Sequence, residues 1–220
     1  AGFLAVIFNI CGRIRDMTAS SEPSDAAKKS SGMAESATWL RGHFLVAMPG
    51  MTDPRFARSL IYLCEHSDQG AMGIVVNKPT DMTLASLFER VELANPDSEL
   101  SGQPVLFGGP VQLDRAFVLH KPANPWQATM KVTDKIALTS SKDILESVGG
   151  ETAPDSILVA LGYAGWVPGQ LDNEILQNAW LSVPADDEIL FDLPYEERLP
   201  AALAKLGIGF DRLSDVAGHA

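Results

Sequence analysis

Short apolar runs alternate along the chain with turn-forming residues, and this pattern predicts a protein rich in short strands. Runs of about four to seven apolar residues, partly β-branched and bounded by Gly, Pro or Asp, are typical of strands. The predicted strands cover residues 44–48, 60–65, 72–76, 105–107, 116–119, 129–132, 136–138, 157–161 and 188–191. The most hydrophobic of these, 157–161, is expected near the centre of a sheet.

Three to four helices are predicted by a different spacing or by helix-boundary residues. In 81–91, Leu84, Leu87, Phe88 and Val91 recur every three or four positions and form one apolar face. The other predicted helices are 140–148, which opens on Ser140 and stops at two glycines, 170–179 and 196–206. Because strands and helices do not alternate strictly, the pattern favours an α+β fold over a doubly wound parallel sheet.

The pattern of predicted strands and helices begins after residue 36, and this sets the predicted domain boundary. Connections are short across residues 37–220 and no internal repeat occurs, so this part is expected to be one compact domain. Residues 18–36 are small, polar and aperiodic, which predicts a disordered tail. The apolar residues 1–10 are too few to span a bilayer and lack a preceding basic region. We therefore expect 1–36 to be a disordered or mis-assigned extension, with the true start at Met17 or Met33.

Composition narrows the function. The chain has 17 Lys and Arg against 28 Asp and Glu, a formal charge of −11. The first 36 residues carry equal numbers of both signs, so the excess acid lies in the predicted domain. Such a surface repels phosphate backbones, and no helix-turn-helix pattern is evident, which argues against direct DNA binding. The two cysteines, Cys11 and Cys64, are too few for a disulfide framework and suit a reducing, cytoplasmic setting.

Four sequence blocks resemble the AlgH/YqgE family of bacterial proteins, which are labelled transcriptional regulators and have no assigned biochemistry. The blocks are LVAMPGMTDPRFARSLIYLCEHSDQGAMGIVVNKP (45–79), LFGGPVQLDRAFVLH (106–120), ALGYAGWVPGQLDNEILQNAWL (160–181) and LGIGFDRLSDVAGHA (206–220). They occur in the family's order; the departures are Ala116, where the family more often has Gly, and Asp172, where it more often has Glu. The resemblance implies a compact α+β domain on a bent, mostly antiparallel or mixed sheet that partly closes.

Cys64, His66 and His120 are the candidates for catalysis. On a regular strand, residues i and i+2 point to one face about 7 Å apart, so Cys64 and His66 could form a thiol–imidazole pair. His120 ends a strand as His66 does, and the two could meet at one rim. The alternative is structural: a buried thiol and hydrogen-bonded histidines. No metal-ligand spacing is present, so neither a metal nor a cofactor is predicted.

The segment GYAGWVPGQLDNE (162–174) is the main candidate for contact with a ligand or partner. Glycines, an aromatic residue and acids lie between a buried strand and a helix, where ligand sites often form. Trp166 could form an apolar wall, with polar contacts from Gln170, Asp172 and Glu174. In the structural alternative, Trp166 fills the core and the acids favour the helix N-terminus.

Two further pairs complete the candidate set. Gly108 and Gly109 could cradle a phosphate, but a tight turn is favoured because the G-K-[ST] of a phosphate loop is missing and no convincing helix follows. Arg55 and Arg58 could bind an anionic ligand, but an ion pair with Asp53 or Glu65 is favoured. An acidic stretch over 186–197, opposed only by Arg198, is either a solvated face or a docking surface.

These residues favour a cytoplasmic, non-enzymatic regulatory or binding module that acts through a protein partner or small molecule, with no membrane and no direct nucleic-acid contact. The alternative is an enzyme of unknown reaction that uses Cys64, His66 or His120.

Overall fold

A computed structural model describes residues 39–95 and 98–207 of the chain. The predicted extension over 1–36 and most of the last family-like block lie outside these residues. The strands are β1 (His43–Ala47), β2 (Leu60–Ser67), β3 (Gly70–Val75), β4 (Pro79–Thr83), β5 (Pro104–Phe107), β6 (Val111–Lys121), β7 (Thr129–Lys131), β8 (Ala137–Thr139), β9 (Ser156–Trp166) and β10 (Trp180–Pro184).

The strands form one curled, half-barrel sheet, and with the surrounding helices they give the predicted α+β class. Its order is β10-β1-β2-β3-β9-β6-β8-β7, and β5 joins β9 while β4 joins β5. Every pairing is antiparallel except that of β5 with β9. The prediction of a bent, mostly antiparallel sheet in a single compact domain is therefore confirmed.

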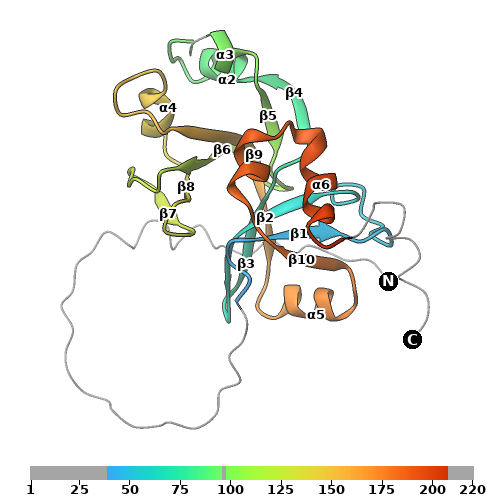
Figure 1. Ribbon diagram of the computed structural model, residues 1–220. Coiled ribbons are helices and arrows are strands. Elements are labelled where there is room, and N and C mark those ends of the chain that lie inside the picture. The colour runs from blue at the N-terminus through green and yellow to red at the C-terminus, as the bar shows by residue number, and fades with distance from the viewer. Residues whose placement is uncertain (1–38, 96–97, 208–220) are drawn as a thin grey trace, which may run out of the picture.

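Strand β9 connects the two halves of the sheet and runs through the middle of the molecule (Figure 1). Its first half pairs with β6, from Lys121↔Ser156 to Ala116↔Leu161, and its last residues pair with β3. The turn between these halves lies at Gly162, whose φ of 72° is in the left-handed region. The sheet curls here because one strand belongs to both halves.

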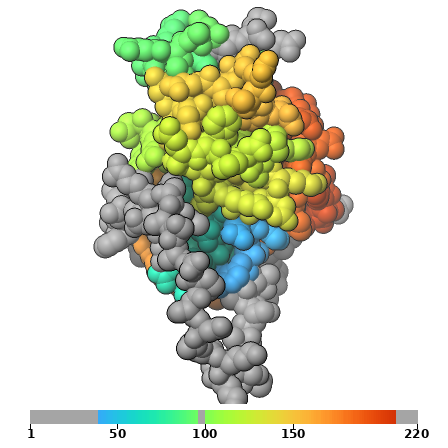
Figure 2. Space-filling model, turned by 90° about the vertical axis from the view of Figure 1, so that its left-hand side faces the viewer, coloured from blue at the N-terminus to red at the C-terminus, as the bar shows by residue number. Residues whose placement is uncertain are grey.

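The helices lie at three places around this sheet. They are α2 (Leu84–Arg90), α3 (Ser98–Ser101), α4 (Asp143–Ser147), α5 (Gln170–Leu176) and α6 (Tyr195–Ala204), with a π-helical turn η1 (Glu188–Asp192). Figure 1 shows α2, α3 and α4 at one end of the molecule, α5 at the other, and α6 beside β1. In Figure 2 the segment around α4, in yellow-orange, separates α2 at the top from the α6 region at the right edge.

Local sequence explains how α2 begins, whereas the structure corrects the prediction for residues 188–191. Thr83 caps α2 by accepting a hydrogen bond from the Ser86 backbone N–H, and the predicted face packs inward. The predicted strand 188–191 is wrong, because this segment forms η1. Ile189 and Leu190 are buried, as predicted for this apolar run, but Leu190 N–H and Leu193 N–H donate to the Asp186 and Glu188 carbonyls within the segment instead of to a neighbouring strand.

Candidate functional site

The 162–174 segment holds a buried hydrogen-bond network centred on Glu174. One Glu174 oxygen, Oε2, accepts from the indole Nε1–H of Trp166 at 2.9 Å and of Trp180 at 2.8 Å. The other, Oε1, accepts from Gln170 Nε2 at 2.9 Å. The Gln170 carbonyl in turn accepts from the Val167 backbone N–H at 3.1 Å. The network ties the end of β9 to α5 and to the start of β10.

This arrangement agrees with the structural alternative for these side chains. Trp166 is 4% exposed and packs edge-to-face on Trp180, so it forms no open wall. Asp172 differs from its neighbours because its side chain is 56% exposed. Of the four residues predicted to contact a ligand or partner in this segment, Asp172 is the one whose polar group faces outward. Its contact role stays a prediction.

Asp172 lies above a buried imidazole from β2. Its Oδ1 is 3.4 Å from His66 Nε2, a nitrogen that makes no hydrogen bond with the described residues. His66 Nδ1 accepts from the Leu40 backbone N–H at 3.2 Å, which places the hydrogen of the neutral ring on Nε2, toward Asp172. Trp39, partly exposed, packs edge-on against the His66 ring at 5.4 Å between centroids. The cluster joins β2 to α5 across the sheet.

A β-bulge separates Cys64 from His66, contrary to the same-face geometry expected of a regular strand. Leu63 pairs with Gly73 and Glu65 pairs with Met72, so Cys64 is the extra residue. One extra residue reverses the alternation. Cys64 therefore packs in the cluster that contains Tyr62 and Met72, whereas His66 is opposite Ala71, which packs in the cluster of the other face. The thiol and the imidazole point away from each other.

The environment of Cys64 is apolar throughout. The side chain is fully buried, and burial raises the pKa of its thiol far above the usual value. Its Sγ–H is directed at the Tyr62 carbonyl, 3.6 Å away. A thiol in this setting stays protonated and does not act as a nucleophile.

His120 lies in a separate chain of hydrogen bonds. Its Nδ1 is 2.9 Å from the Pro122 carbonyl, which can only accept, so Nδ1 carries the hydrogen. Nε2 then accepts from Thr139 Oγ1 at 2.9 Å, Thr139 accepts from Thr129 at 2.7 Å, and Thr129 accepts from the Trp126 backbone N–H. Burial lowers the pKa of His120, which keeps the ring neutral. His66 and His120 do not converge on one rim.

Gly108 and Gly109 lie where two backbones cross. A Cβ on Gly108 would be 2.2 Å from the Gly162 carbonyl oxygen, and one on Gly109 would be 2.1 Å from the Tyr163 carbonyl carbon. Only glycine permits this approach, so the pair holds the loop after β5 against β9. The geometry supports the turn interpretation.

The two arginines of the 53–58 turn have different surroundings. Arg55 forms an ion pair with Asp53 through Nη2 at 2.6 Å and Nε at 3.0 Å, and this bond lowers the pKa of the Asp53 carboxyl. Arg58 has a φ of 58° and lines a cavity of about 540 Å³ with Lys78 and Glu196. The ion-pair interpretation fits Arg55.

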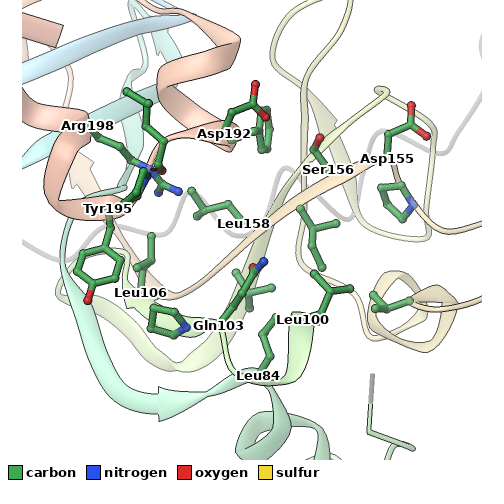
Figure 3. Close-up of a pocket in the computed structure, with 18 of the residues that line it drawn as sticks. Leu84, Leu100, Gln103, Leu106, Asp155, Ser156, Leu158, Asp192, Tyr195 and Arg198 are labelled. Carbon is green, nitrogen blue, oxygen red and sulfur yellow. Dashed lines mark hydrogen bonds between the residues drawn. The ribbon is translucent and has the colours of Figure 1, made fainter. Parts of the chain in front are cut away.

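A second feature, which no local sequence pattern predicts, is a cleft of about 510 Å³ between the α2–α3 end of the molecule and α6. Its walls come from α2, α3, β5, the start of β9 and the η1–α6 segment (Figure 3). Polar and apolar groups contribute about equally to the surface that lines the cleft. The labelled residues are Leu84, Leu100, Gln103, Leu106, Asp155, Ser156, Leu158, Asp192, Tyr195 and Arg198.

Arg198 is the one cation in this lining. The residue is only 9% exposed, and its Nε and Nη1 donate to the Leu193 and Val76 carbonyls at 3.0 and 2.7 Å. Within the described ranges, no carboxylate forms an ion pair with it. Desolvation lowers its pKa to about 10. The guanidinium remains charged at neutral pH and lies buried beside the cleft.

The fold and site define an α+β protein with a curled half-barrel sheet, a lateral cleft and dispersed histidine and cysteine side chains. The chain matches the AlgH-like family (DUF179) over residues 44–211 and belongs to it. UPF0301 proteins of Azoarcus sp. strain BH72 and Dechloromonas aromatica are 62% and 58% identical over 181 residues, which cover 82% of this chain and 96% and 97% of theirs. The solution structure of AlgH from Pseudomonas aeruginosa is 46% identical, with a TM-score of 0.69, and the match covers 86% of this chain and 100% of that one.

These comparisons confirm the family resemblance, and the family's regulator label remains nominal. Across residues 39–95 and 98–207, no helix is both long and apolar enough to cross a membrane. The same residues contain no group of three or more His, Cys, Asp or Glu side chains arranged to hold a metal ion.

Proposed function

We propose that this protein is a cytoplasmic, non-enzymatic binding module that holds a small organic ligand in the cleft between α2–α3 and α6. Any effect on transcription would be indirect, through a protein partner. The observation that carries the proposal is the cleft itself. Its volume, about 510 Å³, lies within the range of about 300–1,000 Å³ usual for small-molecule sites, and its lining combines apolar side chains with polar ones that could orient a ligand.

The positions of the candidate catalytic groups support binding over catalysis. Cys64 is buried with a raised thiol pKa, His120 is held between Pro122 and Thr139, and His66 lies on the opposite face of the sheet from Cys64. The cleft lining contains neither histidine nor cysteine. The enzyme alternative requires a nucleophile and a base within hydrogen-bond reach of each other, and Cys64, His66 and His120 do not supply such a pair.

Charge supports an indirect route to transcription. The excess of 28 acidic over 17 basic residues opposes binding to a phosphate backbone. An acidic surface does not oppose binding to a protein partner in the same way, because exposed polar groups can form the rim of a protein–protein interface. Asp172 and the exposed Leu176 lie on the outer side of α5, and we propose this side as the partner contact.

Filling the cleft tests the proposal without knowledge of the ligand. Ala153 lies in the cleft wall, whereas Ala94 is exposed in a loop outside it, so Ala153→Trp and Ala94→Trp are matched variants. Each full-length protein would be equilibrated with a bacterial metabolite extract, re-isolated and denatured, and the released molecules identified by mass spectrometry. We expect wild type and Ala94→Trp to release the same compound and Ala153→Trp to release none. Equal release from folded Ala153→Trp would contradict a ligand site in the cleft.

A further inference from the structure

The cleft places one buried positive charge beside apolar walls, and this combination specifies a ligand more closely than its volume does. Arg198 reaches from α6 toward the interior of the cleft, on the side of Tyr195 and Leu158 (Figure 3). Its two bonds to described residues are to backbone carbonyls, which are neutral. A guanidinium has five N–H donors, so three have no bond to the described chain.

Arg198 forms no direct ion pair with a described carboxylate, and the charge of nearby Glu196 only partly offsets its desolvation. A buried charge without a direct partner is costly, and natural proteins pair such groups. Arginine also favours carboxylates, because its planar fork matches their two oxygens. The N-terminus of α6 borders the cleft at Pro194 and Tyr195 and also favours an anion through its helix dipole, although Glu196 and Glu197 in its first turn already supply negative charge there.

The rim of the cleft limits how much negative charge the ligand can carry. Asp155, Asp192 and Glu196 line the opening and are exposed, so three carboxylates surround one buried cation. A phosphate or nucleotide would bring two or more negative charges close to these acids. A single carboxylate that reaches Arg198 passes the rim with less repulsion.

The walls determine the rest of the ligand. Leu84, Leu106 and Leu158 form the apolar floor. Leu100 and Phe191 are half-buried and leave apolar surface open to the cleft. An aliphatic or aromatic body would remove this surface from water, which is the main source of affinity in such sites.

We propose that the cleft binds an organic monocarboxylate with an apolar body, its carboxylate on Arg198 and its body along the leucines of the α2, α3, β5 and β9 walls. This inference rests on the proposed small-ligand function and names the class of ligand.

Octanoate and octanamide form a matched pair of probes, because they share a shape and differ in charge. With the full-length protein, isothermal titration or ligand-observed NMR should show octanoate binding at least about tenfold more tightly than octanamide, and no competition by inorganic phosphate. Hydrogen bonds to charged groups are worth about 1.5–3 kcal/mol, so Arg198→Met should weaken octanoate about 10- to 100-fold and leave octanamide unchanged.

A second variant decides the question if Arg198→Met does not fold. Leu100→Glu adds a negative charge to the wall and should abolish octanoate binding, whereas Leu176→Glu, on the exposed side of α5, should not. Equal affinity for octanoate and octanamide, no octanoate binding by wild type, or unchanged octanoate binding by folded Leu100→Glu would overturn the carboxylate inference. The release experiment with Ala153→Trp is independent of ligand class, so the wider binding function would stand or fall separately.

Discussion

Replacement of Glu174 with leucine should strongly destabilise the fold, because Glu174 is the shared acceptor of two buried indoles. Trp166 and Trp180 are 4% and 3% exposed, so water cannot replace the lost acceptor. A buried donor left without a partner costs about 1–3 kcal/mol, which gives about 2–6 kcal/mol for the two N–H groups. Gln170, the third donor, is half-buried and can reach water, so it adds little.

The assay is urea unfolding of the full-length protein, followed by circular dichroism and tryptophan fluorescence. Glu89→Leu is the matched control, because Glu89 is exposed on α2 and its replacement should change stability by less than about 0.5 kcal/mol. Gln170→Ala should cost about 1 kcal/mol, since it removes one neutral donor and one acceptor at a half-buried position. A Glu174→Leu protein within about 1 kcal/mol of wild type would refute the network as the link between β9, α5 and β10.

Four other results are expected. In a Cys11→Ser background, Cys64 should not react with a thiol reagent until the protein unfolds, because burial keeps its thiol protonated; rapid reaction of the folded protein would contradict this. The lowered pKa of His120 means that the unfolded chain binds more protons below the ordinary value of 6.5. The free energy of unfolding should therefore fall as pH drops from about 6.5 toward the lower folded pKa of His120. In urea titrations His120→Gln should reduce the slope of this free energy against pH, and an unchanged slope would contradict the lowered pKa. Gel shifts with mixed-sequence duplex should show no sub-micromolar binding at physiological salt, and tight binding would restore a direct regulatory role. A chain that begins at Trp39 should keep its melting midpoint within a few degrees, and a large decrease would show that 1–36 support the fold.

The sequence predicts those helices and strands whose apolar pattern lies within the segment itself. The 81–91 spacing indicated α2, and the apolar runs over 44–48 and 60–65 indicated β1 and β2, because each segment has its own periodicity. Strands β4 and β10 were not predicted. The first is polar and mostly exposed or half-buried, and the second follows α5 directly, so each is defined by the strand that it pairs with.

The candidate site was harder to predict because its geometry depends on distant contacts. The bulge at Cys64 depends on the register of β2 with β3, and it reversed a relation that simple alternation had suggested. In the sequence, Arg198 stands out only as the lone cation of an acidic stretch. Its burial depends on a bond to Val76, 122 residues away in sequence, and no local pattern shows that.

The most direct test of the central claim is to locate where small molecules bind the full-length protein. Amide NMR spectra of the isotopically labelled chain, recorded against a diverse fragment library, report each contact by residue. If the cleft is the ligand site, hits should shift amides around it, at Gln103, Ser156 to Leu158 and Tyr195 to Arg198, and Ala153→Trp should remove these shifts while Ala94→Trp keeps them. Hits that avoid the cleft and gather elsewhere, or that persist in folded Ala153→Trp, would contradict it.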